Sequence, residues 1–475
     1  MERTISQVFK TGYLILFVML VFANNNLLGF AICAFTILGL VSGNVSIEIA
    51  LMASLVLGNE ITSILHLAIC TSWLLSRHRV RFGKVNAKVG ICVIVILASS
   101  IVNMVISGAF YGPIFGMLYY AIVIFLAFLF KGALNEGKLI ESIKFLIYIE
   151  FFASCVNIVL TRSFHPGDLH KGTLPNAHYF AFWLICVLVY MFIYFKERRY
   201  SLSANVRKNI PYYIAGIFML LMSDGKNVIA GFALTFVIYA FSYVFSKKTK
   251  NRIVLSITIL YAGTFVLILF LHLSVVKSFI VGHFPNVSIY LYDSMYAYKF
   301  MFFEGTLFEE LKGIRSLFGY GIGQYGSRFA NLLGYKFMYR EDNFINNFIA
   351  NHLDSFILPN YEKYASLYTK TLVDNIRWRS AVLSYPFSSV IAFLAENGII
   401  GLTFITYIWG KMANKSKYGI LVIFLFSSCI FDIYFDHISI LALTLVLISS
   451  GEKKQMAQIG KGSNTKLLGI DRSKR

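Results

Sequence analysis

Two short runs in the C-terminal part of the chain combine glycines with an ionisable residue. Residues 319–328 read GYGIGQYGSR, where Gly321 and Gly323 allow the backbone to approach a ligand closely. The run lacks the flanking strand and helix of a nucleotide fingerprint, so its alternative is a flexible turn. Residues 386–401 read PFSSVIAFLAENGIIG and place Glu396 roughly two turns into an apolar run. Glu396 is either a functional group or a hydrogen-bond partner of a neighbouring helix.

Cations suited to holding an anion lie in the same polar stretch and in one turn upstream of it. They are Lys226, Arg315, Arg328, Arg377 and Arg379. Arginine binds a phosphate group through a planar fork, whereas lysine acts as a point charge. Trp378 lies between two of the arginines and offers a flat face on which a sugar ring can stack. The alternative is that these cations are solvated or contact lipid head groups.

The sequence defines the proton acceptors less well. His352 and several carboxylates between residues 276 and 386 could take a proton from a hydroxyl group, and their spacing does not choose among them. Other ionisable residues form two clusters whose spacing fits no standard metal site, although the second could relay protons. These are His165, His170 and His178, and then Asp432, Asp436 and His437. We predict no metal site.

The overall composition indicates the type of fold that positions these residues. The chain has 475 residues, of which 57% are hydrophobic and only 14% are charged. A soluble domain needs about 25% charged residues to cover its surface. The mean hydropathy is +0.69, and apolar runs close to the length of a membrane span recur from end to end. The sequence therefore predicts an all-α polytopic membrane protein, because lipid offers no partner for exposed backbone groups.

Basic clusters between the apolar runs predict the topology. If all of them face the cytoplasm, the chain crosses the membrane through about 12 to 14 helices, with both termini cytoplasmic. The runs 47–58 and 61–75 are short, and Asn59 and Glu60 lie between them, so they could form a hairpin that does not fully cross. The predicted division is a helix bundle, a large outer loop of short helices, C-terminal spans and a basic tail. The boundaries are 1–275, 276–386, 387–450 and 451–475.

Charge and cysteine usage argue against nucleic-acid binding and against a disulfide-stabilised fold. The net charge of +20 follows from the cytoplasmic clusters, and no soluble basic face for nucleic acid is visible. The six cysteines all lie in apolar runs, so no disulfide framework is predicted.

Four stretches together resemble the O-antigen polymerase and O-antigen ligase superfamily. These are GTLPNAHYFAFW (172–183), LLMSDGKNVIAGF (220–232), the Gly-x-Gly of the glycine run, and the SSVIAFLAENGIIGL that opens the returning helix. The layout of many spans and one large late loop is also similar. Gly321 and Gly323 match Gly-x-Gly, and Glu396 with Gly398 matches the Glu-x-Gly of the family.

The resemblance implies a C-type glycosyltransferase fold in a bacterial inner membrane. Its substrate would be an oligosaccharide on undecaprenyl diphosphate, with no metal, nucleotide sugar or other cofactor, since the diphosphate is the leaving group. Lys226 stands where the family has an arginine. Phe387 and Ser388 stand where the ligases have His-Asn, which favours a polymerase. Membrane lipid, a chain-length regulator and a flippase are the implied partners.

Two other functions compete with a polymerase of surface polysaccharide, such as O-antigen, capsule or exopolysaccharide. A glycan ligase would need a histidine base near the outer face, for which His352 is available. A flippase or transporter for lipid-linked sugar would be expected to show two related halves, and no internal repeat is evident.

Overall fold

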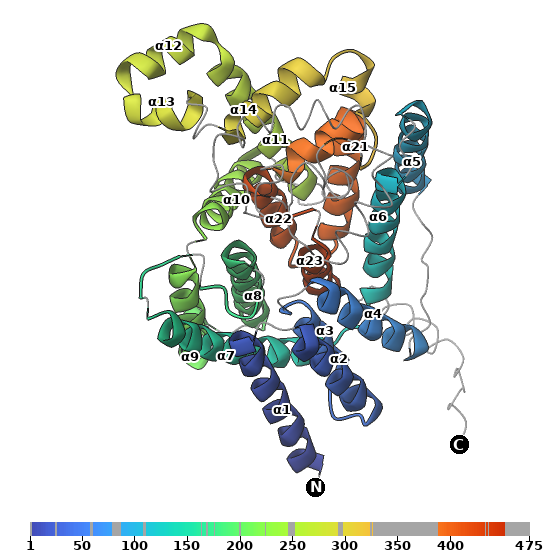
Figure 1. Cartoon of the computed structure of the whole chain (residues 1–475), viewed down its shortest axis with the longest axis vertical. Helices are drawn as coiled ribbons and strands as arrows, with labels where there is room; N and C mark the ends of the chain where they lie inside the picture. Colours follow the sequence, from blue (N-terminus) through green and yellow to red (C-terminus); the bar gives the residue numbers. More distant parts are fainter. Residues whose placement is uncertain are drawn as a thin grey trace, which may run out of the picture.

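The computed structural model shows an all-helical chain, with no β-strand among the residues that it describes (Figure 1). These are residues 2–23, 26–57, 60–77, 87–107, 111–162, 164–167, 170–174, 176–198, 201–223, 225–245, 252–292, 298–323, 325, 388–432, 434–435 and 437–451. The helices are α1 (Glu2–Ala23), α2 (Asn26–Val41), α3 (Ile47–Ser54), α4 (Glu60–Arg77), α5 (Ala87–Ser107), α6 (Tyr111–Phe130), α7 (Glu136–Thr161), α8 (Ala177–Glu197), α9 (Leu202–Met222), α10 (Lys226–Phe245), α11 (Arg252–His272), α12 (Ser274–His283), α13 (Pro285–Tyr292), α14 (Tyr298–Glu304), the π-helical turn η2 (Gly305–Glu310), α15 (Ile314–Phe318), α21 (Ser389–Ala413), α22 (Ile420–Phe431) and α23 (Ile438–Ser450).

Five of the described helices are long and apolar enough to cross a membrane. They are α7, α8, α11, α21 and the segment Lys226–Val244 of α10. Further apolar helices of 10–17 residues include α22 and α23, together with parts of α2, α5 and α6. The chain therefore has the build of a helical membrane protein, as its composition predicts.

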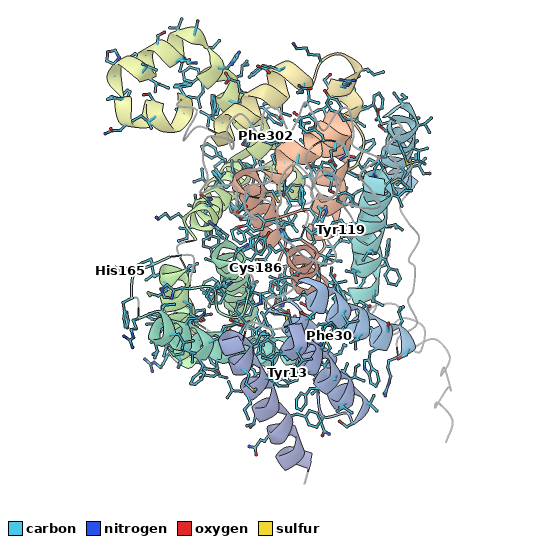
Figure 2. The ribbon with its side chains drawn as sticks, viewed as in Figure 1. Tyr13, Phe30, Tyr119, His165, Cys186 and Phe302 are labelled. Atoms are coloured by element: carbon cyan, nitrogen blue, oxygen red, sulfur yellow. The ribbon has the colours of Figure 1, made fainter. Side chains whose placement is uncertain are left out.

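Helices α8, α22 and α23 form the centre of the bundle. Figure 1 shows them enclosed by α6, α7, α10 and α21. Phe182 of α8 stacks on Phe424 of α22 at 4.8 Å between ring centroids, and Tyr190 of α8 donates or accepts a hydrogen bond with Ser450 at the end of α23. Cys186 lies in this centre, whereas His165 lies at the edge (Figure 2). Because α22 and α23 are short and nearly all buried, protein rather than lipid covers them.

One ion-pair network joins three segments at one end of the bundle. The Lys417 ammonium lies 2.8 Å from a carboxylate oxygen of Glu136 and 2.8 Å from one of Glu197. These residues belong to the start of α7, the end of α8 and the loop before α22. Two of the basic clusters, around residues 196–208 and 411–417, therefore lie on the same side of the bundle.

Helix α9 begins before its apolar run. Hydropathy predicts a span over residues 209–223, whereas α9 begins at Leu202. The Ser201 side chain accepts a hydrogen bond from the Ala204 N–H, which is a normal helix N-cap. The first turns of α9 are mainly polar, so hydropathy alone places the start of this helix too late.

The predicted hairpin at residues 47–75 is present as α3 and α4. Helix α3 has 8 residues, so it is about 12 Å long and too short to cross a bilayer. The last carbonyl groups of such a buried helix need donors. Ser63 donates to the carbonyl of Ser54, and the Thr173 hydroxyl donates to the carbonyl of Val56 at 2.7 Å. The Thr173 N–H in turn binds the buried Glu150 carboxylate at 2.9 Å, which fixes the hairpin to α7.

Replacing Thr173 with valine is expected to destabilise the protein by about 1–3 kcal/mol, because the buried carbonyl of Val56 loses its donor. The matched control is Thr258→Val on the exposed side of α11, where the hydroxyl only bonds the Val254 carbonyl of its own helix. Thermal unfolding of both variants in one detergent measures the difference. Equal melting temperatures would show that the Thr173 hydroxyl does not hold the hairpin.

Short helices fill the described part of the predicted outer loop. They run from α12 to α15, and η2 lies between α14 and α15. His272 at the end of α11 pairs with Glu304 at the end of α14, which ties these helices to the bundle. The expectation of short helices is thus confirmed for residues 274–292 and 298–318.

Candidate functional site

The glycine run packs directly on a break in α21. Gly398 has φ 63° and ψ −174°, so it interrupts the helix in which it lies. The break exposes carbonyl groups that an unbroken helix would use internally. The N–H of Tyr320 donates to Ala395 O at 2.9 Å, and the N–H of Gly321 donates to Glu396 O at 2.7 Å. The two runs singled out in the sequence therefore form one unit, which we call the glycine-turn site (residues 319–323, 325 and 395–398).

The Glu396 side chain lies at the centre of the glycine-turn site. It is 1% exposed. Its Oε2 accepts the N–H of Gly323 at 2.8 Å, and its Oε1 accepts the N–H of Tyr325 at 3.2 Å. Hydrogen bonds from backbone N–H groups to a carboxylate are among the stronger ones in proteins. Glu396 thus determines the shape of the glycine turn.

Two glycines are required where the backbones meet. Gly319 has φ 71°, and a Cβ atom there would lie 2.4 Å from the backbone carbon of Glu396. At Gly398 a Cβ atom would lie 2.1 Å from the carbonyl oxygen of Leu317. Neither backbone atom can move away as a side-chain end could. Gly319 and the glycine of the Glu-x-Gly pattern therefore have a shared steric cause here.

Arg315 is an exposed cation at the edge of the glycine-turn site. Its guanidinium donates to the Tyr320 hydroxyl at 3.0 Å and lies 4.4 Å from the centre of that ring. The Tyr320 hydroxyl donates to the Glu310 carboxylate at 2.5 Å. Burial and the Glu310 carboxylate raise the pKa of Tyr320 to about 12, so this hydroxyl keeps its proton at neutral pH. Tyr320 in turn stacks on Tyr325 at 5.1 Å.

A second group of polar residues lies where α8, α10 and α22 meet. His178 Nδ1 of α8 lies 3.8 Å from Asp432 at the end of α22. Lys226 is the exposed first residue of α10, and the preceding Gly225 packs against Ala181 of α8, one turn from His178. We call this group the helix-end cluster (His178, Lys226 and Asp432). Lys226 lies here rather than in the glycine-turn site.

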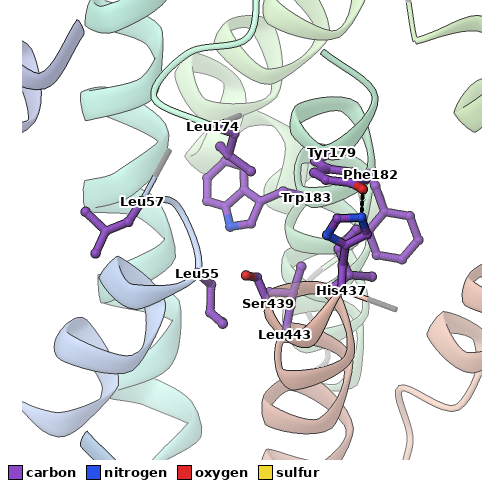
Figure 3. Close-up of a pocket in the computed structure, with 10 residues that line it drawn as sticks. Leu55, Leu57, Leu174, Tyr179, Phe182, Trp183, His437, Ser439 and Leu443 are labelled. Carbon is purple, nitrogen blue, oxygen red and sulfur yellow. Dashed lines mark hydrogen bonds between the residues drawn. The ribbon is translucent and has the colours of Figure 1, made fainter. Parts of the chain in front are cut away.

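A small cavity adjoins the helix-end cluster. It has a volume of about 20 Å³, enough for about one water molecule. The Tyr179 hydroxyl is hydrogen-bonded to His437 Nε2 at its rim, and the indole N–H of Trp183, which makes no hydrogen bond, faces into it (Figure 3). Leu55 and Leu57 from the tip of the α3–α4 hairpin form another part of its wall.

The part of α21 before the break at Gly398 connects the helix-end cluster and its cavity to the glycine-turn site. Ser388 caps the helix by accepting the Ile391 N–H, and its hydroxyl donates to Cys429 O at 3.0 Å. The Ser389 N–H donates to Asp432 O at 3.1 Å, and the Ser389 hydroxyl accepts the N–H of Tyr434 at 2.7 Å. From here the helix rises by about 1.5 Å per residue to Glu396. The two groups of polar residues are therefore separated by roughly two turns of one helix.

The structure brings together four of the predicted site residues and places a fifth elsewhere. Gly321, Gly323 and Glu396 belong to the glycine-turn site, Arg315 lies at its edge, and Lys226 belongs to the helix-end cluster. The predicted His352, Arg328, Arg377, Trp378 and Arg379 lie outside the described residues.

Sequence reasoning missed Tyr179 and the pairing of Asp432 with His178. Tyr179 and His437 are 258 residues apart, and no spacing rule relates them. Within the described ranges, no group of three or more histidine, cysteine or carboxylate residues could hold a metal ion.

No protein-family model, curated protein or solved structure was found to match this chain. Its function has to be inferred from the residues themselves and their geometry.

Proposed function

We propose that the chain is a glycosyltransferase that polymerises the repeat units of a bacterial surface polysaccharide. It would transfer a glycan from undecaprenyl diphosphate to a lipid-linked acceptor unit in the inner membrane. One observation supports this most strongly. Gly323 and Glu396, 73 residues apart, meet in one hydrogen-bonded unit, and they belong to two of the stretches that carry the family resemblance.

The proposed topology has about 12 to 14 helices crossing the membrane, with both termini in the cytoplasm. The Lys417 network supports it, because it places two basic clusters at the same end of the bundle. The helix-end cluster supports it from the other end, where the starts of α8 and α10 meet the end of α22. Helices that cross the membrane in alternating directions would place these helix ends on opposite sides in this way.

In the proposed reaction, the acceptor hydroxyl oxygen bonds to the anomeric carbon of the donor glycan. The bond from that carbon to the diphosphate oxygen breaks, and the diphosphate leaves with the electron pair. Lys226 would stabilise this developing charge, because it is a cation and the first residue of α10, whose N-terminus carries the positive end of the helix dipole. Arg315 and the predicted Arg328, Arg377 and Arg379 would add further positive charge.

The acceptor's proton needs a base. The described residues offer His178, whose Nδ1 lies 3.8 Å from the Asp432 carboxylate. His352 is the alternative base in the loop. Glu396 is better suited to positioning, because both of its oxygens already accept backbone N–H groups.

A glycan ligase is the second candidate. The sequence lacks the ligase His-Asn at Phe387 and Ser388. However, the hydrogen bond from Ser389 to Asp432 brings His178 to the same end of α21. A histidine is therefore available near that position from another helix.

Deleting the gene and analysing the surface glycan on a gel separates the candidates. Loss of a polymerase should leave a single repeat unit on its anchor. Loss of a ligase should leave polymer on the carrier lipid, and loss of a flippase should leave neither product. An unchanged glycan would refute all three.

Replacing Lys226 with alanine is expected to lower the rate of transfer by about 10²-fold, because one cation no longer offsets the leaving diphosphate. Lys226→Arg should retain most of the rate. Lys312→Ala removes an exposed lysine from the segment between η2 and α15 and serves as the matched control. The rates are measured with purified protein and a lipid-linked oligosaccharide. Equal rates for Lys226→Ala and Lys312→Ala would remove Lys226 from the proposed site.

A further inference from the structure

The α12–α13 hairpin (residues 273–292) is an apolar element that the other described helices leave largely exposed. Its sequence, LSVVKSFIVGHFPNVSIYLY, contains one formally charged residue, Lys277. None of the α12 residues is buried. The exposed large apolar side chains are Leu273, Val275, Phe279, Val281, Phe284, Val287 and Ile289. Water-soluble surfaces rarely carry an apolar patch of this extent.

The exposure of the hairpin matches that of a neighbouring membrane helix. Val275 is 79% exposed and Phe279 is 54% exposed, compared with 64% for Val266 and 51% for Leu269 of α11. Helix α11 is apolar enough to cross a membrane, so its exposed side chains have lipid as their solvent. The side chains of α12 are of the same kind and are equally exposed, so lipid is the expected solvent for them as well.

The hairpin is also continuous with the end of α11. Leu273 alone separates α11 from α12, and the Tyr292 hydroxyl at the end of α13 donates to the Leu271 carbonyl at 2.9 Å. The hairpin thus leaves α11 and returns to it. In Figure 1 it projects sideways from one end of the bundle, away from the other helices.

Two polar side chains of the hairpin lie against its own aromatic rings. The Lys277 ammonium lies 5.1 Å from the centre of the Tyr292 ring, and the His283 ring stacks on Phe279 at 4.5 Å. The next segment is different, because it is rich in charge: Glu304, Glu309, Glu310, Lys312 and Arg315. The change from apolar to charged sequence between residues 292 and 304 marks a boundary between lipid and water.

We infer that the α12–α13 hairpin is embedded in the membrane leaflet in which α11 ends, with its apolar side chains among the acyl chains. It is then a monotopic membrane element and not part of a water-exposed loop. It anchors α14 and η2, and through them the glycine-turn site, at a fixed height relative to the bilayer. This inference does not depend on the proposed enzymatic activity.

Spin labelling of the full-length protein in phospholipid vesicles tests the inference. Nitroxide labels are attached at Val275→Cys and Phe279→Cys, and the matched control is Lys312→Cys in the charged segment. Collision rates are measured with molecular oxygen, which concentrates in lipid, and with a water-soluble nickel complex. The unsubstituted protein, labelled in parallel, gives the background from the six native cysteines.

The expected result is that oxygen collisions exceed nickel collisions at residues 275 and 279, and that the order reverses at residue 312. Dominant nickel collisions at either hairpin position would overturn the inference in favour of a water-exposed loop. Low collision rates with both reagents would overturn it in favour of a protein contact, such as a second copy of this chain.

Discussion

Replacing Gly398 with alanine is expected to destabilise the protein by roughly 3–5 kcal/mol, which is at the upper end of single-residue effects. The backbone at Gly398 has φ 63° and ψ −174°, a conformation that costs about 1–3 kcal/mol for other residues. The new Cβ atom would also overlap the carbonyl oxygen of Leu317 at 2.1 Å. Both the bend in α21 and the approach of the chain before the glycine turn would have to change.

The matched control for Gly398→Ala is Gly263→Ala in α11. A Cβ atom at Gly263 meets nothing within 4 Å, and the residue lies within a regular helix. Alanine there should be neutral or stabilise by about 0.5–1 kcal/mol. The measurement is the midpoint of thermal unfolding in detergent, together with the yield of monodisperse protein. Similar midpoints for the two variants would show that the break at Gly398 is not a fixed feature of the fold.

At the glycine-turn site, the sequence indicated the important residues but not the contact between them. Gly321 and Gly323 could be selected because glycine lets the backbone approach a ligand closely, and Glu396 because an ionisable residue is unusual in an apolar run. Their contact could not be predicted, because on the glycine side it is made by the backbone N–H groups of Gly321 and Gly323. Every residue except proline has a backbone N–H group, so such bonds leave no pattern of residue types.

The helices themselves were predictable where apolar runs end in polar turns. The α3–α4 hairpin could be predicted because its runs are too short for a bilayer and Asn59 and Glu60 interrupt them. The start of α9 could not be placed by hydropathy, because a Ser201 cap rather than an apolar residue determines it. The helix-end cluster was hidden for a third reason, since His178 and Asp432 lie on different helices and only the packing of α8 on α22 brings them together.

Substitution of Glu396 has the second large expected effect, and it separates positioning from catalysis. Glu396→Ala leaves the buried N–H groups of Gly323 and Tyr325 without their acceptor. Hydrogen bonds to a charged group contribute about 1.5–3 kcal/mol each, so a loss of roughly 3–5 kcal/mol in unfolding free energy is expected. Glu396→Gln keeps one acceptor oxygen but turns an amide donor toward an N–H donor, so it should also destabilise the protein.

The comparison of stability with activity decides between the two roles of Glu396. If Glu396 positions the glycine turn, Glu396→Gln lowers the unfolding midpoint while the fraction that remains folded keeps most of its transfer rate. If Glu396 exchanges a proton with the substrate, the same variant keeps its midpoint and loses its rate. Glu141→Gln on the exposed surface of α7 is the control and should change neither quantity. The geometry favours the first outcome, because a carboxylate that already accepts two backbone N–H groups at 1% exposure is poorly placed to reach an acceptor sugar.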